Sequence, residues 1–203
     1  PTARRAAPPT SPRRVTKPRA DSVLRVTSRG GWRVVIDGAS PAGAQGFALA
    51  VGLRGRLWRA ELWGEASLPA TLEDALTSVE LARHGVGLAA GLRLWGGRRF
   101  ELWAEGRAGV LAYLRSTVAL DARVVASPSS TSAALLLGAG LRARLRPAPV
   151  KIPGFWLYAG LRADAVIGAP ELVYAQGAGT LVERESLWPL QPTLAFGLAL
   201  ETP

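Results

Sequence analysis

The chain has 203 residues, the length of one domain, and it carries 25 lysines and arginines against 15 aspartates and glutamates, a formal net charge of +10. It contains no cysteine, which excludes disulfide bonds and cysteine-based metal or redox sites. Its apolar runs are shorter than the roughly 18 residues of a transmembrane helix, but a transmembrane β-strand needs only about 9–11 residues of alternating character.

Residues 1–21 differ in composition from the rest of the chain. The first 20 residues contain six basic side chains, no acidic one, frequent prolines and no aromatic residue. Such a segment buries too little apolar surface to fold, so we predict a disordered, Pro/Arg-rich linker at 1–21 and a single domain at 22–203. A basic arm for nucleic acid is the alternative, but the segment lacks aromatic residues that stack on bases, and we expect no nucleic-acid partner.

Alternation of apolar and polar residues runs through most of the remaining chain. In residues 85–107 it forms two runs separated by a Gly-Gly pair, which is the pattern of a β-hairpin. The tripeptide Glu-Leu-Trp at 61–63 returns at 101–103, a shift of 40 residues that is also the period of WD-type propellers. A propeller blade needs four short strands, however, and each repeat here has two long ones, which favours a closed meander. The alternation predicts eight antiparallel strands, at 22–37, 46–54, 58–67, 83–94, 100–115, 132–146, 155–167 and 193–201.

The connections between the predicted strands alternate in length. Those after the second, fourth and sixth strands are short, and the others are mostly longer, including polar loops at 68–78 and 117–131 and the longest connection at 168–190. This layout is typical of an all-β, up-and-down transmembrane β-barrel of the outer-membrane type, and eight strands can close such a barrel without an edge. Both chain ends then lie at the end with short turns, which places the N-terminal linker in the periplasm.

The two faces of the strands indicate which side points inward. One face carries aliphatic residues and phenylalanine with almost no charge, and the other mixes glycine and alanine with arginines and carboxylates. A soluble barrel of the lipocalin type would instead expose a polar face rich in lysine, glutamate and threonine. Because buried charges persist only when they are paired, we predict a membrane barrel whose lumen is filled by ion pairs. The predicted lumen network comprises Arg54, Arg59, Glu61, Glu65, Arg93, Glu101, Glu105, Arg107, Arg142, Arg144, Arg162 and Asp164.

In this arrangement of strands, turns and charged lumen residues, the stretch 22–203 resembles the small eight-stranded outer-membrane barrels of Gram-negative bacteria, the OmpA/OmpX-like group. The resemblance implies a place in the outer membrane, contact with outer-membrane lipids and lipopolysaccharide, and a role in anchoring, adhesion or interaction more often than in chemistry. One feature departs from the group. Such barrels commonly end in Phe or Trp, whereas this chain ends Leu200-Glu201-Thr202-Pro203.

Three features of the sequence mimic catalytic or cofactor sites. Gly85-x-Gly87-x-x-Ala90 and its counterpart at 138–143 resemble a dinucleotide fingerprint, but that motif precedes a helix and these glycines lie within strands. The glutamates at 61, 65, 101 and 105 could be paired carboxylates of a hydrolase, but arginines surround them. His84, the only histidine, faces outward and has no serine partner. We therefore expect no enzyme activity and no cofactor.

Two functions of different classes fit such a barrel. The first is a structural anchor or interaction protein, whose basic N-terminal tail could reach a periplasmic domain or partner and whose surface loops serve recognition. The second is a narrow channel for small solutes, although charged side chains crowd the lumen face. A membrane-embedded lipid-modifying enzyme is a weaker third. For recognition, the longest connection offers Tyr174, Glu183, Glu185 and Trp188.

Overall fold

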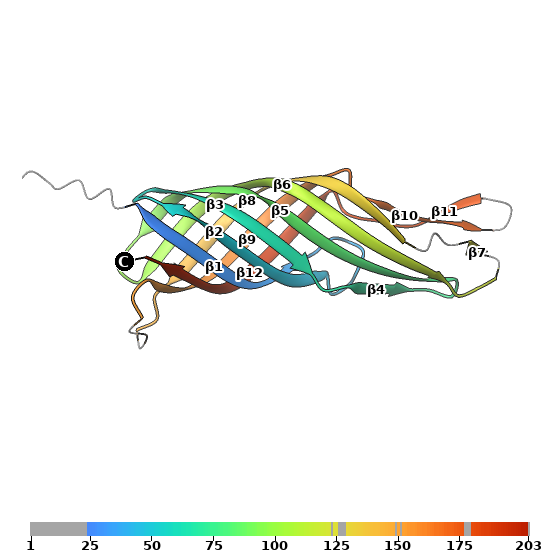
Figure 1. Ribbon diagram of the computed structural model, residues 1–203, viewed down its shortest axis with the longest axis horizontal. Helices are drawn as coiled ribbons and strands as arrows, with labels where there is room; N and C mark the ends of the chain where they lie inside the picture. The colour runs from blue at the N-terminus through green and yellow to red at the C-terminus, as the bar shows by residue number, and fades with distance from the viewer. Residues whose placement is uncertain are drawn as a thin grey trace, which may run out of the picture.

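The computed structural model describes residues 24–202 except 123, 126–128, 149, 151 and 177–179, and between 173 and 185 it describes the backbone only. The linker predicted at 1–21 lies outside these residues. Among the residues described, no helix is long and apolar enough to cross a membrane. The strands (Figure 1) are β1 (Arg25–Val35), β2 (Ala44–Arg54), β3 (Trp58–Ser67), β4 (Ala70–Glu73), β5 (Thr77–Gly96), β6 (Phe100–Ala119), β7 (Val124–Val125), β8 (Ser129–Leu145), β9 (Phe155–Ile167), β10 (Glu171–Gln176), β11 (Thr180–Ser186) and β12 (Leu190–Glu201).

Long antiparallel strands close into a barrel. The main sheet has nine strands, in the order β3, β2, β1, β12, β9, β8, β6, β5 and β4, and β5 also pairs with β3. Since β4 only extends the edge of β5, the other eight strands form a complete ring. The first and last strands of the chain meet in register, with Trp32 opposite Phe196 and Val34 opposite Leu194. The predicted eight-stranded up-and-down barrel is confirmed.

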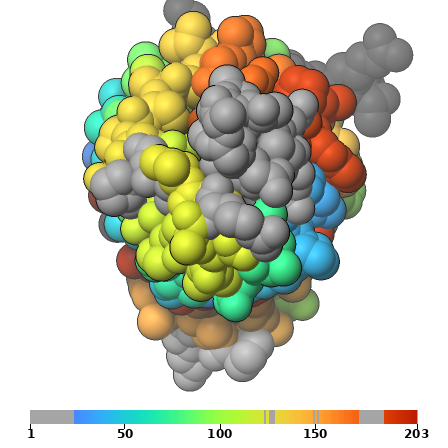
Figure 2. Space-filling model, turned by 90° about the vertical axis from the view of Figure 1, so that its right-hand side faces the viewer, coloured from blue at the N-terminus to red at the C-terminus, as the bar shows by residue number. Residues whose placement is uncertain are grey.

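The two ends of the barrel differ in their connections. The turns β2–β3, β5–β6 and β8–β9 lie at one end, called here the short-turn end, together with the end of β12 (Figure 1). The opposite end, called the loop end, carries the longer connections, and there β4, β7, β10 and β11 extend beyond the barrel. Figure 2 faces this loop end, where segments of every part of the colour scale gather around the rim.

The structure corrects the loops expected at the loop end. Strands β5 and β6 continue further than the alternation predicted, and β4 occupies part of the polar loop expected at 68–78. The connection at 117–131 includes the end of β6, the short β7 and the start of β8. The stretch 168–190 is not a plain loop, because it contains the β10–β11 hairpin, and β10 also pairs with β7. Strands β4, β7, β10 and β11 are short and lack a sustained alternation of apolar and polar residues, so the periodicity of the sequence does not predict them.

The barrel has an apolar exterior and a charged interior. Leu49 and Leu88 are each 68% exposed, whereas Arg33 and Asp164 have no exposed surface. A protein folded in water buries leucine and exposes arginine, so this reversal requires an apolar medium around the barrel. The orientation of the two strand faces follows the pattern predicted from the sequence.

Glycines on the inner face make room for large lumen side chains. Trp63 of β3 is buried, and in the sheet it pairs with Gly87 of the neighbouring strand β5. A Cβ atom at Gly87 would lie 2.7 Å from the Trp63 ring, and one at Gly109 would lie 2.5 Å from it. Both distances are shorter than van der Waals contact, so only glycine fits at these positions beside the indole. The glycines that mimic a dinucleotide motif therefore serve packing.

An apolar cluster fills the loop end of the barrel. It contains buried residues from the ring strands, including Leu81, Leu111 and Leu136, together with Leu72 of β4 and Leu172 of β10. The segment before β12 adds Leu187, which is also buried. Side chains from the small loop-end strands thus pack against the inner faces of β5, β6 and β8. An apolar core therefore covers the charged lumen at the loop end.

Candidate functional site

The lumen network begins at the short-turn end with two carboxylates that share arginines. Arg54 of β2 contacts both Glu101 of β6 and Glu201 of β12, the former at 2.5 Å. Arg144 of β8 also reaches both, at 3.3 Å and 2.5 Å. Arg93 lies 3.6 Å from Glu101 and is the one predicted network residue that is partly exposed. This layer ties five strands together across the barrel.

A second layer lies in the middle of the lumen. Glu61 accepts a hydrogen bond from Arg29 at 3.1 Å and lies 3.3 Å from Arg142. Arg142 also reaches Glu105, at 2.5 Å. Glu105 in turn contacts Arg59 at 2.6 Å and Arg162 at 3.5 Å. A cavity of about 10 Å³ lies among Arg29, Arg59, Glu61 and Arg142, which is room for about one water molecule.

The third layer, next to the apolar cluster, is centred on Glu65. Arg107, Arg83 and Arg33 all point to this one carboxylate, at 2.9, 3.1 and 3.4 Å. Arg107 also donates two hydrogen bonds to Asp164, at 2.9 and 2.6 Å. This fork-to-fork geometry is the strongest form of an arginine–carboxylate pair.

The third layer continues into the loop end through side-chain hydrogen bonds. Arg83 donates to the Gln191 side chain at 2.5 Å, and Gln191 donates to the Trp188 carbonyl at 2.9 Å. The Trp188 amide donates to the Asp37 carbonyl at 2.7 Å. The chain around Trp188 is therefore fixed to the lumen network and to the β1–β2 connection.

Aromatic rings lie among the arginines of the lumen. Arg54 and Arg59 both stack over Trp103, each with 4.9 Å between the guanidinium carbon and the ring centroid. Arg107 lies 4.8 Å from the centroid of Trp63. Guanidinium groups bind well to the negative faces of aromatic rings, so these contacts compensate part of the cost of removing the charges from water.

Eleven of the twelve predicted lumen residues are buried, and each of the twelve takes part in an ion pair with another interior side chain. The prediction omitted Arg29, Arg33, Arg83 and Glu201, which complete the three layers. All four lie on the polar strand face, so the alternation alone could have included them. Among the described residues the interior buries nine arginines and seven carboxylates, an excess of two positive charges.

The four glutamates and the histidine that could mimic a catalytic site in the sequence do not form one in the structure. Each of the glutamates at 61, 65, 101 and 105 is engaged by at least two arginines. His84 lies on the outer face between Ala66 and Ala112, away from the lumen. Within the described part of the chain, no group of three or more histidine, aspartate and glutamate side chains could hold a metal ion.

The candidate recognition residues lie at the loop end. Tyr174 is in β10, and Glu183 and Glu185 are in β11, where the backbone pairs Glu183 with Val173. The side chains of these three residues lie outside the described part of the structure. Trp188, just before β12, is half exposed, and its ring lies directly over Gly38. Gly38 has a φ of 85°, so this close approach combines with a backbone conformation that favours glycine.

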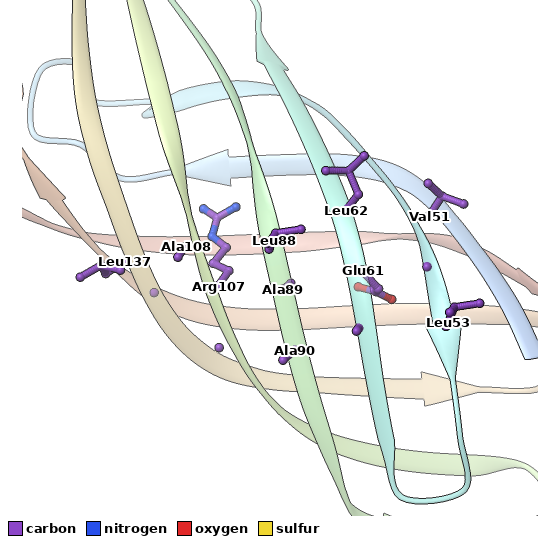
Figure 3. A pocket seen from close by; sticks show the side chains of 14 residues that line it. Val51, Leu53, Glu61, Leu62, Leu88, Ala89, Ala90, Arg107, Ala108 and Leu137 are labelled. Atoms are coloured by element: carbon purple, nitrogen blue, oxygen red, sulfur yellow. The ribbon is translucent and has the colours of Figure 1, made fainter. Parts of the chain in front are cut away.

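The outer wall has a shallow groove of about 830 Å³ (Figure 3). Small residues in register across three strands, Ala60, Ala90 and Gly106, form its floor. Leucines from β2, β3, β5 and β8 stand around them, among them Leu62 and Leu88 (Figure 3). The groove is apolar and lies on the exposed leucine face, so its surroundings are those of the barrel wall as a whole.

No protein-family model and no curated protein matches the sequence. Solved structures do match. They include a major outer membrane protein from Thermus thermophilus (TM-score 0.61, 16% identity, covering 88% of this chain and 99% of that one). Neisserial surface protein A matches with a TM-score of 0.53 and 12% identity, over 87% of this chain and 96% of that one. The attachment invasion locus protein Ail of Yersinia pestis matches with a TM-score of 0.52 and 14% identity, over 88% and 97%.

The likeness to these neighbours extends over most of each chain. At such low identity the likeness concerns architecture and not chemistry. The chain has the fold of the small eight-stranded outer-membrane β-barrels, the OmpA/OmpX-like group.

Proposed function

We propose that this protein is a non-enzymatic interaction protein of the bacterial outer membrane, in which the barrel is a rigid anchor and the loop end is the recognition surface. The observation that carries the proposal is the filled interior. Three ion-pair layers occupy the lumen, and an apolar cluster covers them at the loop end. With the interior committed to packing, binding falls to the segments outside the membrane.

The fixed position of the chain at Trp188 supports this role. The Trp188 backbone is held by hydrogen bonds with Asp37 and Gln191, and Gln191 is bonded to the lumen arginine Arg83. The Trp188 ring nevertheless remains half exposed. A large exposed aromatic side chain on a fixed backbone is a suitable anchor for a partner, because little conformational entropy is lost on binding.

The proposal includes an orientation in the membrane. With the loop end outside the cell, the short-turn end and the N-terminal tail face the periplasm, where the tail could connect the barrel to a periplasmic domain or partner. The leucine-rich wall would contact outer-membrane lipids, and lipopolysaccharide would surround the half nearest the loop end. Nothing in the described lumen favours the alternative of a channel.

A first prediction concerns conductance. Barrels reconstituted into planar phosphatidylcholine bilayers are expected to show no discrete current steps, because ion pairs and the apolar cluster block the axis of the barrel. A sixteen-stranded porin reconstituted in parallel is the positive control. Regular single-channel steps from the purified barrel would contradict the proposal and support a narrow channel.

A second prediction concerns the charge of the partner. The loop-end segments 36–43, 68–76, 120–128 and 168–189 together contain seven acidic and two basic residues. We therefore expect a cationic partner, in contrast to the Ail structure that contains the heparin analogue sucrose octasulfate.

The test uses intact cells that display the barrel, so that only the loop end is accessible. Fluorescent oligolysine is expected to bind these cells more than cells with an empty vector, and fluorescent sucrose octasulfate is expected to bind both equally. Exchange of the exposed Glu73 and Glu171 for glutamine should reduce oligolysine binding. Selective binding of sucrose octasulfate would refute the predicted charge of the partner.

A further inference from the structure

The short-turn end contains a pocket that neither the fold nor the proposed function uses. It has a volume of about 300 Å³ and is lined by Arg25, Arg54, Gly55, Arg56, Arg93, Glu101 and Trp156. Four arginines against one glutamate give the lining a formal charge of +3. The pocket therefore has the electrostatic character of an anion site.

The carboxylate in the pocket is already engaged. Glu101 accepts hydrogen bonds from Arg54, Arg144 and the Trp103 indole, at 2.5, 3.3 and 3.1 Å. The nearby Glu201 likewise serves Arg54 and Arg144. These two glutamates are thus paired with the buried arginines Arg54 and Arg144. They compensate the charge of the arginines at the rim of the pocket only weakly.

The arginines at the rim retain binding capacity. Arg25 approaches Glu201 only to 4.0 Å, and its side chain is 47% exposed. Arg93 approaches Glu101 to 3.6 Å, which is beyond hydrogen-bond distance. Arg56 is exposed in the turn between β2 and β3. The three guanidinium groups come from three separate segments of the barrel and border one cavity.

The interior behind the pocket reinforces its positive potential. Trp156 forms part of the pocket wall, and the guanidinium carbon of Arg144 lies 4.7 Å from the centroid of its ring. Arg144 is buried, and its Nε and Nη2 atoms have no hydrogen-bond partner in the described part of the chain. An anion in the pocket would add to the compensation that Glu101 and Glu201 give this buried charge.

We propose that this pocket binds a phosphate group from the periplasmic side. A phosphate presents several acceptor oxygens in a tetrahedron, so it can bind guanidinium groups that converge from different directions, whereas a carboxylate has only two oxygens in one plane. Two sources share this chemistry: a soluble phosphate, and the headgroup of a phospholipid. Leu57 and Trp58, which follow the pocket residue Arg56, are exposed on the lipid-facing wall and bring headgroups within reach.

The experiment is calorimetric titration of the folded barrel in an uncharged maltoside detergent, with two probes in separate arms. One probe is inorganic phosphate, and the other is the short-chain lipid dihexanoyl phosphatidylglycerol. We expect saturable binding of at least one probe below about 10 mM. Binding of phosphate alone identifies a soluble source, and tighter binding of the lipid identifies a headgroup.

Two double variants decide whether the pocket is the site. R25Q/R56Q removes two rim charges and is expected to weaken binding by at least about tenfold. The matched control R98Q/R99Q removes two charges from the neighbouring β5–β6 turn, outside the pocket, and should change the affinity less than about twofold. Unchanged heat-modified gel mobility shows that each variant is folded.

The proposal is overturned if neither probe binds, or if both double variants lose affinity equally, which would indicate a diffuse basic surface. Because Arg25 and Arg56 both lie at the short-turn end, loss of binding in R25Q/R56Q is independent of recognition at the loop end.

Discussion

Replacement of Glu65 by glutamine is expected to lower the free energy of unfolding by about 3–5 kcal/mol, the cost of removing one partner from a buried ion pair. Glu65 is the shared carboxylate of Arg33, Arg83 and Arg107. Without its charge, three buried guanidinium groups would face one another with only Asp164 nearby. Glutamine keeps the size of the side chain, so the effect reports charge and not a cavity.

The measurement is urea unfolding of barrels in phosphatidylcholine vesicles, followed by tryptophan fluorescence. Glu80→Gln is the matched control, because it makes the same chemical change at an exposed position of the neighbouring strand β5, and it should alter stability by less than about 0.5 kcal/mol. Equal stability of the two variants would contradict the assignment of Glu65 as the centre of the third layer.

A compensating substitution sharpens the test. Arg33 has no exposed surface, and none of its three guanidinium nitrogens has a hydrogen-bond partner among the described residues. In the double variant Arg33→Gln/Glu65→Gln one positive charge is removed together with the negative one. We expect this double variant to recover part of the stability lost in Glu65→Gln, which would appear as a non-additive double-mutant cycle.

Much of this architecture can be predicted from the sequence, because a strand has an exact period of two. Once Leu88 and Leu92 are placed outward, Ala89 and Arg93 must face inward, and hydrogen-bonded neighbours follow in register. The presence of arginines and glutamates on the same face then predicts paired charges. The identity of the partners cannot be predicted in this way, because pairs such as Arg54 with Glu201 join residues 147 positions apart through closure of the ring.

The loop end could not be predicted by the same argument. At 134–137 the sequence reads Ala-Leu-Leu-Leu, and Leu136 points into the apolar cluster while its neighbours point outward. An unbroken apolar run is typical of a strand that is buried on both faces. A prediction that assigns one apolar and one polar face to each strand does not recognise such a run. The β10–β11 hairpin could not be predicted for a related reason. Its strands show no sustained alternation, and β10 is held by pairing with β7.

Replacement of Leu88 by arginine is expected to cost about 2–4 kcal/mol of stability in lipid vesicles, the depth-dependent penalty for a charge near the midplane on the lipid face of a barrel. Leu88 is 68% exposed and lies in the middle of β5, opposite Leu62 on one side and Ala108 on the other. Its side chain cannot turn into the lumen, because the inner face at this level is filled by Trp63 and its neighbours.

The control is Leu120→Arg, because Leu120 is also an exposed leucine but lies just beyond the end of β6 at the loop end. We expect it to change stability by no more than about 1 kcal/mol, as for charges near the interface. The same urea titration distinguishes the two positions. If both substitutions were mild, the leucine face would be exposed to water and not to lipid, and the barrel would have to be a soluble one. A large loss at Leu88 alone would locate the hydrocarbon core across the middle of β5, because Leu120 lies beyond the end of β6 and Leu88 lies within the barrel wall.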